Sequence, residues 1–123
     1  MKIRAYGKTK KELFLNMASG MQDALQPTTN NKQLTTRSLK IRASNLETLL
    51  VDFLSEILYL IQVNKEIYKD IKFKKFTDME IRAELIGQKV ASFGEDIKGV
   101  TYHDLEIKQN PMGIWQATVL FDV

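Results

Sequence analysis

The chain has 123 residues, which suits one compact domain and is too short for two ordinary ones. Its content of 44% hydrophobic and 27% charged residues excludes a disordered, collagen-like or coiled-coil chain, and the absence of cysteine excludes disulfide frameworks, thiolate zinc sites and cysteine nucleophiles. A net charge of +3 permits contact with RNA but is well below that of a dedicated nucleic-acid-binding protein.

The first predicted elements are a strand and a helix. Residues 2–6 are strand-like and lack the apolar stretch of a signal peptide; since no later window could span a membrane either, we expect a cytoplasmic protein. Thr9 and Glu12 have the spacing of a capping box, which starts a helix that ends before Pro27. Apolar residues recur on one face of this helix: Phe14, Met17, Ala18, Met21 and Leu25.

A second strand and a second helix follow. Residues 32–43 alternate between apolar and polar, as in a strand with one solvated face. Ser44 and Glu47 have the spacing of another capping box, ahead of the most apolar helix of the chain. We expect this helix at the centre of the core, with these residues buried: Leu46, Leu49, Leu50, Phe53, Leu54, Ile57, Leu58 and Ile61.

Asp52 and Glu56 belong to the polar stripe of the second helix. Carboxylates one turn apart repel each other, so such a pair is either tolerated on a solvated face or used to hold a cation. We favour the solvated face.

The rest of the chain predicts four strands. Residues 68–77 and 79–85 should pair, and residues 98–108 and 114–122 should form a hairpin around a five-residue turn. The order of elements predicts an α+β fold, a two-layer sandwich in which two helices pack on one face of a mixed or antiparallel sheet. Residues 1–123 should form a single domain.

The lysines of residues 69–75 accompany Phe73 and Phe76. Basic residues interleaved with aromatic ones can bind a nucleic-acid strand. However, Phe73 shares its face with Ile71, so we favour a role for Phe73 in the core.

His103 is the only histidine, which excludes a metal site built from two or three imidazoles. By strand alternation it lies with Thr101, Leu105 and Ile107, where we expect a structural histidine with satisfied hydrogen bonds. The sequence has no glycine-rich phosphate-binding motif and no nucleophile elbow. A hydrolase built on Asp122 and His103 is disfavoured because their alternation places them on opposite faces of the sheet.

Three polar side chains are expected to converge near the end of the chain. If the hairpin pairs Lys108 with Ile114, Asp122 lies on the same side of the sheet as Lys98 and Tyr102. This group is either a polar site or an ordinary surface pair of lysine and aspartate, which contributes little to stability. From the residues alone we favour the surface pair.

Four segments of the chain, taken in order, resemble the archease family: residues 3–9 with 12–14, residues 49–60, residues 98–103 and residues 120–123. The run Val100-Thr101-Tyr102-His103 is the most distinctive. The resemblance implies a small α+β domain that is not an enzyme but assists the RNA-splicing ligase, which joins 2′,3′-cyclic-phosphate or 3′-phosphate ends to 5′-hydroxyl ends. The domain would promote guanylylation and turnover of this ligase, with weak or indirect contact to RNA. The alternative that the resemblance implies is a chaperone or specificity modulator of a tRNA methyltransferase or another RNA-modifying enzyme.

The resemblance also implies a site for a divalent cation such as Ca²⁺, Mn²⁺ or Mg²⁺. The matching ligands are Asp122 and the carbonyl of Val123, and Lys98, Tyr102 and His103 line the same region. The family's N-terminal His-Thr-Ala-Asp segment has no counterpart in this sequence. One carboxylate and one carbonyl leave most of the coordination shell to water, so we expect weak cation binding and little stimulation of the ligase by this chain.

Overall fold

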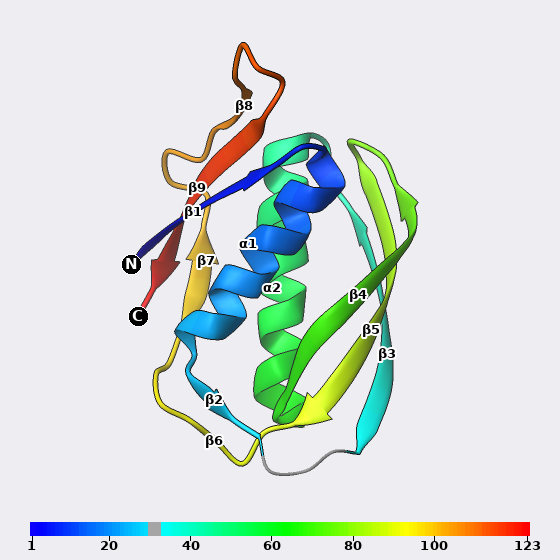
Figure 1. Cartoon of the computed structure of the whole chain (residues 1–123), viewed down its shortest axis with the longest axis vertical. Helices are drawn as coiled ribbons and strands as arrows, with labels where there is room; N and C mark the ends of the chain where they lie inside the picture. The colour runs from blue at the N-terminus through cyan, green and yellow to red at the C-terminus, as the bar shows by residue number, and fades with distance from the viewer. Residues whose placement is uncertain (30–32) are drawn as a thin grey trace.

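Two helices lie between two larger antiparallel sheets (Figure 1). The computed structural model describes residues 1–29 and 33–123. One sheet has the order β1-β9-β7, with β8 also paired to β9, the other has the order β3-β5-β4, and β2 pairs with β6. The bounds are β1 (Lys2–Gly7), α1 (Lys10–Ala24), β2 (Pro27–Thr28), β3 (Leu34–Arg42), α2 (Leu46–Asn64), β4 (Glu66–Phe76), β5 (Glu80–Lys89), β6 (Ser92–Phe93), β7 (Gly99–Thr101), β8 (Ile107–Gln109) and β9 (Trp115–Asp122). The first residue of the predicted strand 32–43 lies outside the described residues.

The α+β class is confirmed, but the strands form separate sheets rather than one sheet with both helices on one face. Helix α2 contacts β3, β4 and β5 of one sheet and β7 of the other, and α1 also contacts both sheets. The physical reason is the width of the apolar surface of α2. Its buried residues cover about 200° of the helix circumference at 100° per residue, which one sheet cannot bury alone.

The predicted start of α1 is confirmed. Thr9 is the N-cap residue, and its hydroxyl accepts a hydrogen bond from the backbone N–H of Glu12 at 3.1 Å. The carboxylate of Glu12 accepts in turn from the backbone N–H of Lys8 at 3.2 Å. The two hydrogen bonds of this capping box therefore connect the residue after β1 to the first turn of α1.

The predicted start of α2 is wrong by one residue. Asn45, not Ser44, is the N-cap residue, and its side-chain oxygen accepts from the backbone N–H of Thr48 at 2.8 Å. Asparagine and serine cap helices about equally well, so spacing alone does not decide between neighbours. With this start Glu47 lies in the first turn, where the helix dipole favours a carboxylate.

Within the described ranges, no helix is both long and apolar enough to cross a membrane.

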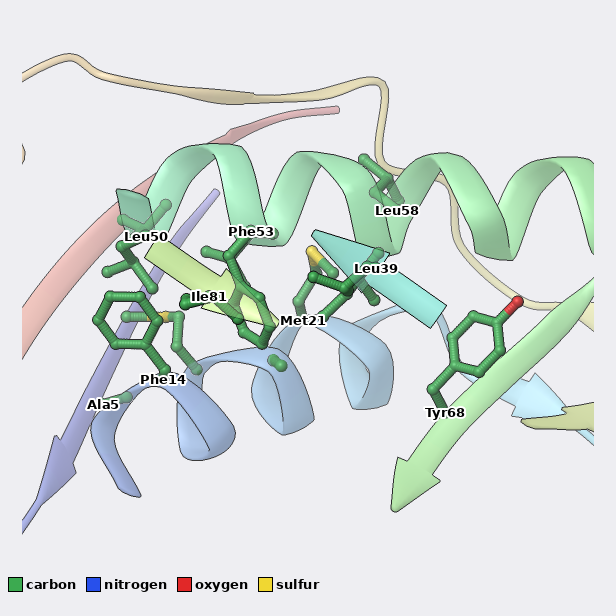
Figure 2. Close-up of a cluster of buried hydrophobic side chains, with 14 of the residues drawn as sticks. Ala5, Phe14, Met21, Leu39, Leu50, Phe53, Leu58, Tyr68 and Ile81 are labelled. Atoms are coloured by element: carbon green, nitrogen blue, oxygen red, sulfur yellow. The ribbon is translucent and has the colours of Figure 1, made fainter. Parts of the chain in front are cut away.

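Four phenylalanines connect both helices to β4. The ring of Phe14 lies 5.7 Å from that of Phe53 and 5.0 Å from that of Phe76, and Phe73 lies 5.8 Å from Phe53. In Figure 2 the side chains of Phe14 and Phe53 fill the space between the two helices. The predicted core position of Phe73 is confirmed, since it packs against the core with the other rings.

One carboxylate is fully buried beside this core. Both oxygens of Glu66 accept from the Arg37 guanidinium at 3.1 Å, and the Tyr68 hydroxyl donates to Glu66 Oε1 at 2.9 Å. The Lys89 ammonium lies 3.8 Å from the other oxygen. Paired donors of this kind offset the cost of removing a carboxylate from water.

The free edge of β4 is partly occupied by α1. The buried side-chain amide of Gln22 accepts from the backbone N–H of Tyr68 at 2.5 Å and donates to its carbonyl at 2.9 Å, as a neighbouring strand would. The pairing of β4 with β5 is also shifted twice, between Tyr68 and Asp70 and between Phe73 and Lys75. These bulges increase the local twist of the strand.

Truncation in the centre of α2 should be costly. Phe53 and Ile57 are fully buried, so Phe53→Ala or Ile57→Ala should each lower the free energy of unfolding by about 2 to 5 kcal/mol through lost burial and a residual cavity. Leu34, which is 65% exposed, is the control, and Leu34→Ala should change stability by less than about 0.5 kcal/mol. Urea denaturation measures all three. Costs below about 1 kcal/mol for both buried residues would show that α2 is peripheral.

Glu66 should make the protein sensitive to acid. Burial raises the pKa of its carboxyl, but hydrogen bonds from Arg37 and Tyr68 lower it to about 2, below the ordinary 4.5. Because the pKa is lower in the folded state, the contribution of Glu66 to stability is complete above pH 4.5 and is lost as the pH falls toward 2. Urea unfolding at a series of pH values should show this decrease in the free energy of unfolding.

Glu66→Gln is the matched variant for that measurement. It should lower the free energy of unfolding by on the order of 3 kcal/mol at neutral pH, because it removes one partner of a buried ion pair. It should also reduce the decrease of that free energy between pH 4.5 and 2, which we call the acid limb. Glu80→Gln is the second variant, since the hydrogen bond from Lys75 also lowers the pKa of Glu80 to about 2. An acid limb that keeps its full slope in both variants would contradict this account.

Candidate functional site

Strand β9 lies between β1 on one side and β7 and β8 on the other, and its pairing decides which side chains meet at the chain end. The predicted pairing of Lys108 with Ile114 is wrong, because Lys108 lies opposite Gln116. At the other end of the strand, Asp122 lies opposite Gly99. The predicted continuous hairpin is thus two short pairings with different registers.

The physical reason lies in the apolar face of β9. Its buried residues Ala117 and Phe121 lie opposite Ile107 and Val100, so both partners add to the same apolar face. One partner has an odd number and the other an even number, and a continuous strand cannot direct both to one face. Residues 102–106 form no strand, and Asp104 in this segment has a positive φ of 53°. The interruption allows both apolar residues to reach the core.

The predicted convergence of Lys98, Tyr102 and Asp122 is wrong as a consequence. Pairing with Gly99 places the Asp122 side chain on the face of Gly99 and Thr101 rather than with Lys98 and Tyr102. Lys98 still lies next to Asp122 through the backbone, since its N–H donates to the Asp122 carbonyl at 2.6 Å. The Lys98 side chain is exposed.

Tyr102 instead meets the polar stripe of α2. Its hydroxyl donates to Asp52 Oδ1 at 2.6 Å, a short bond typical of a charged acceptor. This bond, helped by partial burial and the negative charge of Asp52, raises the pKa of Tyr102. Asp52 and Glu56 also line a shallow surface depression of about 510 Å³ together with Arg42 and Tyr59.

The pair of Asp52 and Tyr102 is a site feature that the sequence analysis missed. The two residues are separated by 50 positions, so no local spacing rule connects them. Each was singled out separately, Asp52 on a polar helix stripe and Tyr102 in the most distinctive segment. Only the packing of α2 on β7 brings them together.

His103 is not the structural residue that its alternation predicted. Its side chain is exposed in the interrupted segment, and Nε2 lies 3.1 Å from Asp104 Oδ2. Its backbone N–H donates to the Thr101 hydroxyl at 3.3 Å. The same interruption that corrects the register removes His103 from the sheet.

The residues at the chain end do not complete a cation site. Among the described residues, no three His, Asp or Glu side chains come together as metal ligands, and the Asp122 carbonyl already accepts from Lys98. Asp122 and Val123 are both exposed. They offer a carboxylate and a main-chain carbonyl, fewer than the six to eight oxygen ligands that Ca²⁺ takes.

Comparisons with known proteins agree with each other. The model of the Archease protein family matches residues 1–123. A protein archease from Methanosarcina barkeri is 34% identical over 131 aligned positions, covering 100% of this chain and 89% of that protein. One from Pyrococcus furiosus is 30% identical, covering 98% and 90%. The crystal structure of an archease from Thermotoga maritima, described as a possible chaperone, has a TM-score of 0.77 at 15% identity, covering 100% of this chain and 90% of that one.

The bond between Tyr102 and Asp52 can be tested by titration. In Asp52→Asn the acceptor loses its charge, so the pKa of Tyr102 should fall toward the ordinary 10.0. NMR of labelled tyrosine rings measures the change. Glu56→Gln is the matched control, because it removes a carboxylate one helical turn away and leaves the bond intact. An unchanged Tyr102 titration in Asp52→Asn would contradict the contact.

Proposed function

Because the chain belongs to the archease protein family, we propose that it is a non-enzymatic accessory protein that activates an RNA-splicing ligase by promoting its guanylylation and turnover. The observation that supports this proposal most strongly is the match of the family over the whole length of the chain. The archeases from Methanosarcina barkeri and Pyrococcus furiosus are 34% and 30% identical to this chain, and these alignments cover 89% or more of each protein.

The site residues receive roles under this proposal. Lys98 lies directly before β7 and Tyr102 and His103 directly after it, and all three are exposed, so they can contact another protein. Tyr102 is held in place by its bond to Asp52, so less side-chain entropy is lost when a partner contacts it. Asp122 and the Val123 carbonyl are the proposed ligands of this chain for a divalent cation.

A second candidate function is that of a chaperone or specificity modulator of a tRNA methyltransferase or another RNA-modifying enzyme. The description of the Thermotoga maritima archease as a possible chaperone favours this broader role. It requires contact with a protein but no cation. The two functions therefore differ in how strongly they depend on Asp122.

The test is the rate of guanylylation of the RNA-splicing ligase from the same source, with and without this chain. The chain should increase this rate if it acts as proposed. Asp122→Ala should abolish the stimulation, because it removes the proposed carboxylate ligand, and Lys98→Ala should weaken it. Calorimetric titration with Ca²⁺ and Mn²⁺ should show that Asp122→Ala binds each cation more weakly than the unchanged chain does.

Lys11→Ala is the matched control, because Lys11 is exposed on α1 and is not one of the candidate site residues. It should leave stimulation unchanged. Stimulation that Asp122→Ala leaves intact would remove the cation from the proposal. Absence of any effect on the ligase, together with an altered specificity of a tRNA methyltransferase, would favour the second candidate function.

A further inference from the structure

The outer face of the sheet β3-β5-β4 carries a concentrated positive charge. Alternate residues of β5 face away from the helices, namely Glu80, Arg82 and Glu84, because Ile81 and Ala83 between them are buried in the core. Their partners on β3 and β4, together with Lys74 in a bulge of β4, complete a surface that we call the basic face: Lys40, Arg42, Lys72, Lys74, Lys75 and Arg82, with Glu80 and Glu84.

The basic face holds more net charge than the whole protein. Its six cationic and two acidic side chains give +4, whereas the complete chain has +3. The other parts of the chain together are therefore slightly acidic. The next row of the sheet, with Thr36, Ile86 and Asp70, ends the basic face.

Three cations lie side by side in one row across the sheet. Lys40 on β3 and Lys75 on β4 are both directly opposite Arg82 on the central strand. Side chains in such positions are about 5 Å apart, and like charges there destabilise a sheet. A surface that served only solubility would alternate the signs of its charges, so this row points to an anionic ligand.

Glu80 organises the cations without neutralising them. Its carboxylate lies 2.7 Å from Lys75 Nζ, 3.2 Å from Arg82 Nε and 3.5 Å from Arg42 Nε. Its side chain is only 9% exposed, so it lies beneath the three cations. One negative charge under three positive ones fixes their positions and leaves a positive surface toward solvent.

The face is suited to phosphates rather than to bases or to a protein. Phe73 and Phe76 point into the core, so no aromatic ring of the described β4 is available on this face to stack on a base. None of its described residues is an exposed large apolar side chain, although such side chains anchor protein interfaces. Lysine and arginine side chains bind the phosphates of the nucleic-acid backbone.

We propose that the basic face binds the phosphate backbone of folded, base-paired RNA without regard to sequence. The choice of RNA over DNA rests on the proposed function, because rows of cations bind either backbone. The sheet presents its cations in fixed rows on a surface that faces away from the helices (Figure 1), so a duplex backbone can lie across it without entering a cleft. This inference goes beyond the proposed function, since it concerns binding of RNA by this protein alone.

The test uses the complete chain and an RNA hairpin of about 20 base pairs, measured by fluorescence anisotropy at a series of salt concentrations. The variant is Lys40→Gln, Lys72→Gln and Lys74→Gln combined, because these lysines lie outside the Glu80 cluster and their loss leaves that carboxylate paired. Affinity at low salt should fall about tenfold or more, and the slope of log affinity against log salt should decrease by about 2 to 3.

The matched control is Lys2→Gln, Lys8→Gln and Lys11→Gln combined, which removes the same charge from exposed positions on and near β1 and α1. It should retain affinity within about twofold. Equal losses in both variants, or no binding of the hairpin by the wild-type chain, would overturn the proposal. Tighter binding of polyglutamate than of RNA would overturn it in favour of an acidic protein. The ligase is absent from these measurements, so their failure is distinguishable from failure of the proposed function.

Discussion

The width of the apolar surface of α2 is the constraint on which the rest of the fold depends. A helix that buries about 200° of its circumference cannot be covered by one sheet and one neighbouring helix on a single face. The second sheet closes the remaining side, and β7 of that sheet lies against α2. The contact between Tyr102 and Asp52 exists because of this closure. The polar arc of the same helix then becomes part of the candidate site.

Local patterns predicted the elements well because they depend on neighbouring residues. The cap at Thr9, the pairing of β4 with β5 and the core position of Phe73 follow from spacing and alternation, and the structure confirms them. The number of sheets could not be predicted in this way. Strand alternation shows that one face of a strand is buried, but not which strands share a sheet. The choice between Asn45 and Ser44 is also too finely balanced for spacing to decide.

The candidate site was predicted only in part, and one hidden change of alternation explains most of the difference. Val100 and Ile107 are both apolar and both needed in the core, although their numbers differ in parity. The polar residues between them gave no sign of where the strand stops. Consequently Lys98 lies on the opposite face of the sheet from Asp122, and His103 lies on an exposed segment. Similarity to the archease family still directs attention to this end of the chain.

The amide of Gln22 has a consequence for the behaviour of the protein at high concentration. An unpaired edge strand offers its backbone groups to any other extended chain, and β4 is such an edge in the described sheet. Gln22 occupies the backbone of Tyr68 from within the same molecule. Beyond that point, two bulges and several lysines make the remaining edge twisted and charged. The addition of another strand at this edge, the first step of aggregation, is therefore disfavoured.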